Sequence, residues 1–244
     1  MKRSELSIVI PAYNEQARLP YTLSELQAFV CDEKLDCEII VVDNGSTDAT
    51  SVVIQQAMAR FPTLRLLRTD RRGKGLAVRT GMLAARGAVA LFADADLSWS
   101  LEELVRFPAL VTPETPVVVG SREGQGAQRR GEPSYRHLMG RVFNGVVQML
   151  AVPGIDDSQC GFKAFAADAA RAIFRRQTID GFGFDVEVLF LARRLGYGVR
   201  VVPLGWEHKH NSRVEPLRDT VGMLADVLRV RLNEWGGRYD DEDA

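Results

Sequence analysis

Apolar and polar residues follow two repeating patterns in the first half of the chain. The β-branched run "LSIVIPA" at 6–12 predicts a buried strand that ends at Pro11, because short apolar runs bounded by proline are typical of strands. In the next segment, 14–30, apolar residues recur every three or four positions, which predicts a helix. The same patterns predict further strands at 37–43, 64–70 and 88–96 and further helices at 49–61 and 73–86.

Strands and helices that alternate in this way, with short connections, are typical of one kind of sheet. They indicate a mostly parallel central sheet with helices on both faces, a Rossmann-like arrangement. The predicted fold class is therefore α/β.

The second half of the chain has a less regular order. The pattern predicts a strand at 116–122, a polar loop at 123–136, helices at 137–151, 184–197 and 216–235, a strand followed by a helix at 161–174, and a strand at 199–208. There is no internal repeat and no low-complexity linker. We therefore expect a single domain at 1–235, with halves meeting near residue 120, and an acidic tail at 236–244.

Polar clusters follow three of the predicted parallel strands. They are "PAYNE" at 11–15, "VDNGSTD" at 42–48 and "DADLS" at 94–98. Ligands of open α/β sheets bind beyond the carboxyl ends of the strands. The three clusters are therefore expected to line one crevice.

Asp94 and Asp96 are an unusual end for an apolar strand. Residues two apart in an extended segment project to the same face, and two carboxylates there repel each other unless a cation lies between them. Oxygen ligands favour Mg²⁺ or Mn²⁺, and Mg²⁺ is commonly held by one or two carboxylates and substrate phosphates. The alternative is structural, with Asp96 as the cap of a helix that begins near Ser98.

Charge and cysteine content limit the possible partners and location of the protein. The net charge of −1 gives no electrostatic footprint for nucleic acid, so we expect no nucleic-acid partner. Three cysteines match neither a disulfide framework nor a zinc site, which favours a cytoplasmic location. Cys160 has no histidine partner nearby in the sequence and is not expected to be a nucleophile.

Seven segments of the chain resemble glycosyltransferase family two, and more narrowly its polyprenyl-phosphate (dolichyl-phosphate) hexosyltransferases. They occur in the order typical of that family and cover residues 4–235. They are "SIVIPAYNE", "EIIVVDNGSTDAT", "GKGLAVRTGM", "ADADLS", "VVGSR", "DSQCGFKAF" and "GFGFDVEVLFLARRLGYGVRVVPLGW".

The resemblance implies a nucleotide-diphospho-sugar transferase fold of the GT-A type. Residues 1–120 would then form the nucleotide-sugar half and 121–235 the acceptor half. Asp94 and Asp96 would hold Mg²⁺ or Mn²⁺ on the donor diphosphate. The implied donor-binding residues are Pro11, Tyr13, Glu15, Asp43, Lys74 and Asp94.

The chain departs from the family pattern at two positions. Asn44 replaces a second aspartate that many relatives carry after Asp43, and Ser98 stands where some mannosyltransferase relatives have a glutamine at the metal site. The segments "SQCGFK" and "FDVEVLFLA" resemble the glucosyltransferase branch more closely. UDP-glucose is therefore the favoured donor over GDP-mannose.

A lipid monophosphate acceptor would need cations rather than a base. Its second pKa is about 6, so it is already anionic near neutral pH and can attack directly. Arginine is well suited to bidentate phosphate contact. The candidate acceptor-binding residues are Arg122, Arg136, Lys163, Ser212 and Arg213.

Two other functions remain open from the sequence. An inverting transferase that acts on a soluble or saccharide hydroxyl would need a general base, and Asp185 is the candidate, although it could instead cap a helix. A non-catalytic nucleotide-sugar-binding protein is the second alternative, which the intact pair of aspartates disfavours. The predicted catalytic residues are Asp96, Asp185 and Arg122.

A prenyl acceptor would be met at a membrane surface. No apolar run approaches the length of about 18 residues that spans a bilayer, so contact would be peripheral, at the cytoplasmic face, or through a membrane-anchored partner. Helix 138–150 and helix 216–235 are the candidates for this surface, and the second carries a stripe of Leu217, Val221, Leu224 and Leu228 beside arginines. Such stripes more often face the core of their own domain, and we expect that here. Homo-oligomer formation is left open.

Overall fold

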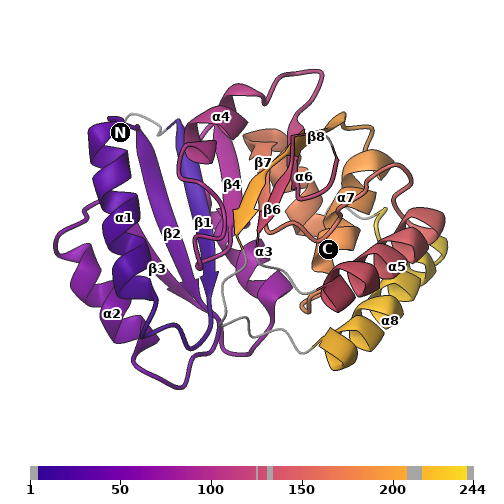
Figure 1. Cartoon of the computed structure of the whole chain (residues 1–244), viewed down its shortest axis with the longest axis horizontal. Coiled ribbons are helices and arrows are strands. Elements are labelled where there is room, and N and C mark those ends of the chain that lie inside the picture. The colour runs from indigo at the N-terminus through magenta and orange to yellow at the C-terminus, as the bar shows by residue number, and fades with distance from the viewer. Residues whose placement is uncertain (1–4, 125, 131–133, 208–215, 241–244) are drawn as a thin grey trace.

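A seven-stranded sheet runs through the molecule, with strand order β3-β2-β1-β4-β7-β5-β8, and β6 pairs with β9 in a second, small sheet (Figure 1). The computed structural model describes residues 5–124, 126–130, 134–207 and 216–240. In chain order the elements are β1 (Leu6–Ala12), α1 (Leu19–Asp32), β2 (Cys37–Asp43), α2 (Thr50–Met58), β3 (Leu64–Arg68), α3 (Lys74–Ala84), β4 (Val89–Ala93), α4 (Glu103–Ala109), β5 (Val117–Ser121), β6 (Gln128–Arg130), α5 (Ser134–Leu150), β7 (Phe162–Ala166), α6 (Ala167–Arg176), α7 (Phe184–Arg194), β8 (Val199–Pro203), β9 (Gly205–Glu207) and α8 (Pro216–Trp235).

Helices cover both faces of the large sheet, as the sequence predicts. Alternate residues of β1 point to opposite sides, so Ile8 and Ile10 pack with α1, α2 and α4, while Val9 packs with α3, α6 and α7. Because both faces are covered, β1 and β2 are almost entirely buried and mostly apolar, and the buried Ser7 hydroxyl donates to Glu38 on the neighbouring strand at 2.7 Å.

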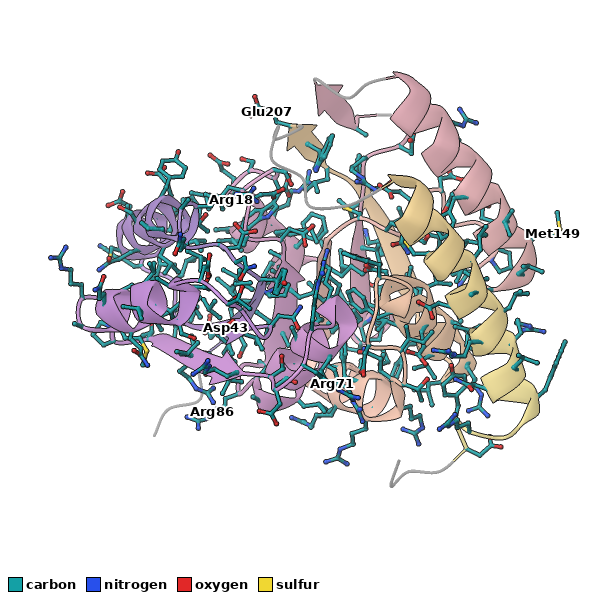
Figure 2. All side chains as sticks on the ribbon, turned by 90° about the horizontal axis from the view of Figure 1, so that it is seen from below. Arg18, Asp43, Arg71, Arg86, Met149 and Glu207 are labelled. Atoms are coloured by element: carbon teal, nitrogen blue, oxygen red, sulfur yellow. The ribbon has the colours of Figure 1, made fainter. Side chains whose placement is uncertain are left out.

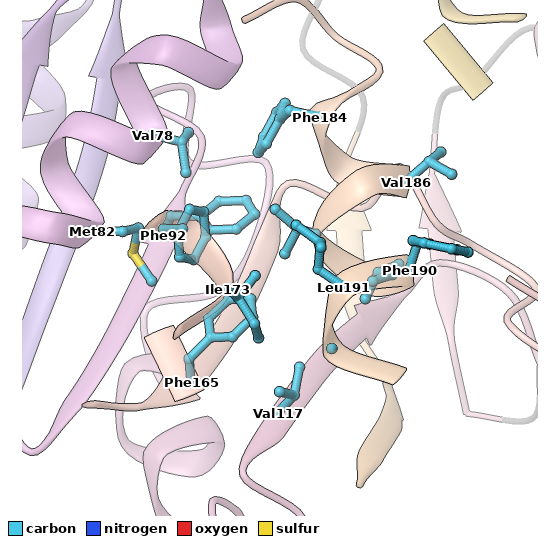
Figure 3. Close-up of a cluster of buried hydrophobic side chains, with 14 of the residues drawn as sticks. Val78, Met82, Phe92, Val117, Phe165, Ile173, Phe184, Val186, Phe190 and Leu191 are labelled. Carbon is cyan, nitrogen blue, oxygen red and sulfur yellow. The ribbon is translucent and has the colours of Figure 1, made fainter. Parts of the chain in front are cut away.

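An aromatic cluster fixes α6 and α7 to the sheet (Figure 3). The ring of Phe92 on β4 stacks on Phe165 of β7, with 6.2 Å between centroids, and meets the edge of Phe174 at 6.5 Å. Phe184, the first residue of α7, lies 5.7 Å from the same ring. The start of α7 is therefore held against the end of β4.

Strand β7 is the one antiparallel member of the large sheet in the described residues. It lies between β4 and β5, and Lys163 is opposite Phe92 on one side and Val119 on the other. All other pairs in this sheet are parallel. The predicted mostly parallel sheet is confirmed, and this reversal brings Lys163 into its centre.

Two predicted segments were wrong and one helix was missed, because short elements leave little periodic signal. The predicted loop at 123–136 contains β6, three residues long, and the start of α5. The predicted strand at 199–208 is divided at Leu204 into β8 and β9. Helix α4, seven residues with Pro108 inside it, was not predicted at all.

Helix α8 faces the core as expected, and Leu224 of the predicted stripe packs there partly buried, but Leu228 does not. Val227 and Val230 are fully buried, whereas Leu228 is 54% exposed. The side chains of Leu217 and Val221 lie outside the described ones. No helix in the described part of the chain is long and apolar enough to cross a membrane.

The predicted acidic tail begins inside the fold. Tyr239 is fully buried, and its hydroxyl donates a hydrogen bond of 2.8 Å to Glu187 Oε1 on α7. The end of the chain is thereby fixed to α7 as far as residue 240, while 241–244 lie outside the described residues.

Candidate active site

The turns that follow β1 and β2 are bonded to each other. The backbone N–H of Asn14 donates to Ser46 Oγ at 2.9 Å, and Asn14 Oδ1 accepts the N–H of Thr47 at 2.8 Å. One residue on, the N–H of Glu15 donates to Thr50 Oγ1 at 2.8 Å. These contacts join two of the three polar clusters predicted to line the crevice.

Asp43 ends β2 beneath these turns, with only 1% of its surface exposed (Figure 2). It accepts the backbone N–H of Ser46 at 2.9 Å and the hydroxyl of Ser51, and Arg68 lies 3.7 Å away. Burial raises the pKa of Asp43, but these hydrogen bonds and the arginine outweigh it and lower the pKa overall. The carboxylate is therefore ionised at neutral pH.

The residues of "PAYNE" that were predicted to bind the nucleoside lie beside Asp43. Pro11 pairs with β2 near the end of β1, and Tyr13 is half-buried beneath the guanidinium of Arg72, 4.5 Å above its ring. The Glu15 carboxylate is buried and lies 3.5 Å from Arg18. Their contact with a nucleoside stays a prediction.

The first turn of α3 is held tightly against the connection between α6 and α7. A Cβ on Gly73 would meet the carbonyl oxygen of Asp180 at 2.7 Å, and one on Gly75 would meet that of the preceding residue at 2.4 Å. Asn44 Oδ1 accepts the N–H of Gly73 at 2.8 Å. Asn44, which the sequence suggested only as a missing carboxylate, therefore anchors the turn that presents Lys74.

Asp96 lies in a turn that begins directly after Asp94, which corrects the extended geometry assumed for the pair. Strand β4 ends at Ala93 and the chain turns at 95–96. The N–H of Asp94 donates to the Gly161 carbonyl at 3.1 Å. Asp96 Oδ1 accepts the N–H of Ser98 at 3.0 Å, but no helix begins there, so the helix-cap alternative is also wrong.

Gly161 makes room for the carboxylate of Asp94. A Cβ at this position would lie 2.0 Å from Asp94 Oδ2, far inside contact distance. On its other side Asp94 Oδ1 is 2.6 Å from Lys74 Nζ. Burial lowers the pKa of Lys74, but Asp94, Asp185 and Asp96 raise it overall. Lys74 therefore pairs directly with Asp94 and also feels the charges of Asp185 and Asp96 at the end of the sheet.

Lys163 is a second ammonium, below this group and without exposed surface. Its Nζ donates to the Cys160 carbonyl at 2.7 Å and to Asp185 Oδ1, and it lies 5.3 Å from the centroid of the Phe92 ring. Burial raises the pKa of Asp185, and the charges of Lys163 and Lys74 oppose that rise. In this structure the predicted acceptor residue Lys163 contacts Asp185, not solvent.

Asp185 lies in the first turn of α7, and the residue before that helix is Gly183, so Asp185 is not its N-cap. Only 2% of its surface is exposed. The thiol of Cys160 is equally enclosed, and burial raises its pKa to about 12. This value supports the expectation that Cys160 is not a nucleophile.

Arg122 is held by Asp157 in a bidentate pair. Arg122 Nε and Nη2 donate to the two carboxylate oxygens, each at 2.8 Å, and the Arg122 backbone N–H donates to Oδ2 at the same distance. Trp206 lies beside the guanidinium, 5.5 Å away. Burial raises the pKa of Asp157, but the contacts with Arg122 outweigh it and lower the pKa. Contact of Arg122 with an acceptor stays a prediction.

The remaining candidates cannot be placed. Arg136 lies on α5, but its side chain is outside those described, and Ser212 and Arg213 are outside the described residues altogether. The structure therefore shows the predicted donor-binding residues more completely than the predicted acceptor-binding residues.

Asp94 and Asp96 could bind a divalent metal ion if the phosphates of a bound substrate supply further ligands. Among the described residues, no group of three or more His, Cys, Asp or Glu side chains could hold a metal by itself. Asp94 and Asp96 offer hard oxygen ligands, and Asp94 is seated in the space that Gly161 leaves. Mg²⁺ and Mn²⁺ fit such a pair when substrate phosphates supply further ligands.

We predict that Asp157→Asn costs about 2 kcal/mol of unfolding free energy at pH 7, because it leaves the largely buried Arg122 without its counter-charge. The pKa of Asp157 is lower in the folded protein than in the unfolded chain. Its ionised carboxylate therefore stabilises the fold above the unfolded pKa, and this stabilisation is lost as the pH falls through the folded pKa. The difference in unfolding free energy between the wild type and Asp157→Asn should therefore decrease below about pH 4.

Urea unfolding measured from pH 7 downward tests this. The control is Asp168→Asn, since Asp168 is 90% exposed in its pair with Arg171 and its loss should change stability by less than about 0.5 kcal/mol. A difference in unfolding free energy that increases toward low pH would contradict the assigned role of Asp157.

Comparison with known proteins agrees with this geometry. The model of glycosyl transferase family 2 matches residues 7–182. Dolichyl-phosphate beta-glucosyltransferases of Dictyostelium discoideum and Mus musculus are each 34% identical to the chain, over 93% and 96% of it and 74% and 77% of their own lengths. Glucosyl-3-phosphoglycerate synthase from Mycobacterium tuberculosis, solved with phosphoglyceric acid, has the same fold, with a TM-score of 0.69 at 21% identity over 93% of this chain and 80% of that one. The predicted GT-A type α/β fold is confirmed, and the chain belongs to glycosyl transferase family 2 and is a glycosyltransferase.

Proposed function

We propose that the protein transfers glucose from UDP-glucose, with inversion, to a polyprenyl phosphate such as dolichyl phosphate. The relatives that share most of the chain are dolichyl-phosphate beta-glucosyltransferases, which supports both the sugar and the acceptor. We also propose that 1–235 act as one domain, in which 1–120 bind the donor and 121–235 the acceptor.

The burial of Asp185 is the observation that favours a phosphate acceptor over a hydroxyl. A general base must reach the proton that it removes. Asp185 is 2% exposed and its carboxylate is bonded to the buried Lys163 ammonium. A phosphate acceptor makes no such demand, because it carries its own negative charge near neutral pH.

The donor diphosphate is proposed to lie between the first turn of α3 and the turn at 94–96. Asp94 and Asp96 would hold Mg²⁺ or Mn²⁺, which would neutralise the charge of the leaving diphosphate. The same fold in the mycobacterial synthase has been solved with Mn²⁺ and UDP-glucose. Lys74 lies 2.6 Å from Asp94 and would place a second positive charge beside the phosphates.

The proposed reaction is a single displacement. An oxygen of the acceptor phosphate forms a bond to the anomeric carbon as the bond from that carbon to the donor diphosphate breaks, and UDP leaves with the electron pair. Asp43 and Glu15 would orient the nucleoside by accepting hydrogen bonds. Asp185 would stay paired with Lys163 beneath the site.

A screen of donors and acceptors tests the proposal. Purified protein with Mn²⁺ or Mg²⁺ should form a lipid-linked sugar from UDP-glucose and a polyprenyl phosphate in detergent, faster than from GDP-mannose. A chelator should abolish transfer, and either metal should restore it. Glycosylation of a soluble hydroxyl without any lipid-linked product would contradict the proposal.

The double variant Lys163→Met/Asp185→Asn separates a base from a structural ion pair. It removes both buried charges together, so neither is left unpaired and the fold should survive. We expect transfer to a prenyl phosphate to fall by less than about tenfold, since no proton is removed. Single Asp185→Asn should be less stable than the double variant by thermal unfolding. A loss of several orders of magnitude in the folded double variant would instead support the hydroxyl acceptor with Asp185 as base.

Gly161→Ala tests whether the position of the Asp94 carboxylate matters for transfer. The added methyl group would meet Asp94 Oδ2 at 2.0 Å, so that carboxylate must move. We expect transfer to fall by about 100-fold, because small displacements of positioning groups are that costly. The matched control is Gly205→Ala, where a Cβ meets nothing within 4 Å. Equal activity of the two variants would argue against a role for the Asp94 position.

A further inference from the structure

Helix α8 carries a second apolar stripe on the side away from the core. Leu228, Leu232 and Trp235 are 54%, 61% and 74% exposed. Their spacing of four and three residues places them on one face, whereas Val227 and Val230 are buried on the other. The helix is therefore apolar on two sides, and only one of them packs on this chain.

Helix α5 extends this exposed surface. It packs beside α8, and Met149, near its end, is 84% exposed. Figure 2 shows Met149 projecting away from the body of the protein on the side where α5 and α8 lie. We call Met149, Leu228, Leu232 and Trp235 the α5/α8 face. Single exposed apolar residues are ordinary, but four on two adjacent helices mark an interaction surface.

The charges beside this face are positive. The Arg229 side chain is 64% exposed, and the Arg231 guanidinium lies 5.8 Å from the centroid of the Trp235 ring. The described acidic groups nearby are engaged: Glu234 and Asp240 both pair with Arg194, and Asp226, whose side chain is 18% exposed, lies 3.6 Å from Arg229. The surface thus combines apolar side chains with arginines at its edges.

We propose that the α5/α8 face rests on a bilayer that contains anionic phospholipids. Trp235 and the leucines would enter the headgroup boundary, and the two arginines would contact lipid phosphates, the arrangement typical of interfacial helices. Pairing of this face with a second copy is disfavoured, since a twofold contact would bring like arginines together. The inference deepens the proposed function, because its acceptor is a lipid, but it can be tested separately.

Sedimentation with vesicles of phosphatidylcholine and phosphatidylserine tests the proposal on the full chain. The wild type should bind, and Leu228→Glu/Leu232→Glu should reduce binding by at least about tenfold. The matched control is Tyr21→Glu/Val52→Glu, which makes the same charge change at residues 64% and 51% exposed on α1 and α2. It should bind like the wild type. Equal losses in both variants, or none in the first, would overturn the proposal.

Three further measurements complete the test. Arg229→Gln should weaken binding to these vesicles more than to phosphatidylcholine alone. A dimer in solution that Leu228→Glu/Leu232→Glu dissociates would show that the face binds a second copy and would overturn the proposal. Transfer to a short, water-soluble prenyl phosphate should stay at the wild-type rate in the same variant. Absence of such transfer in the wild type would count against the proposed function, whatever the vesicle result.

Discussion

The balance of charge at the end of the sheet constrains the rest of this structure. Asp94, Asp185 and Asp96 all raise the pKa of Lys74 there, and Asp94 also raises the pKa of Asp185, because like charges disfavour each other's ionised form. Lys74 and Lys163 offset this repulsion. The two lysines come from α3 and β7, far apart in the sequence, so the fold must deliver both elements accurately. The close contact of the first turn of α3 and the aromatic cluster beneath α7 serve that requirement.

The antiparallel strand β7 explains why one short segment, 160–163, provides several of the contacts to the carboxylates of the site. Its register against β4 places the Cys160 carbonyl where it accepts a hydrogen bond from Lys163, and Gly161 where it accepts one from Asp94 and leaves room for that carboxylate. Lys163 follows at the centre of the sheet. A side chain at the glycine would displace Asp94, and a neutral residue at the lysine alone would leave Asp185 without its counter-charge.

The sequence predicts those parts of the molecule that depend on local periodicity. The alternating strands and helices, and the polar ends of the strands, follow from spacing alone, and the structure has them. The turn at 94–96, the anchoring role of Asn44 and the burial of Lys163 depend on contacts between distant segments, which no local pattern contains. Helix α8 shows a different limit. Two of its faces are apolar, and periodicity could not indicate that Val227, rather than Leu228, faces the core.

Helix α7 connects the site with the end of the chain. Asp185 faces the lysines, and two residues later the buried Glu187 accepts hydrogen bonds from the backbone N–H groups of Thr178 and Ile179 and from Tyr239. Each of these buried donors would cost about 1 to 3 kcal/mol if left unpaired. The segment that follows α8 therefore cannot move away from α7 without that cost. Because Ile179 belongs to the connection that contacts the first turn of α3, α7 joins the end of the chain to the turn that presents Lys74.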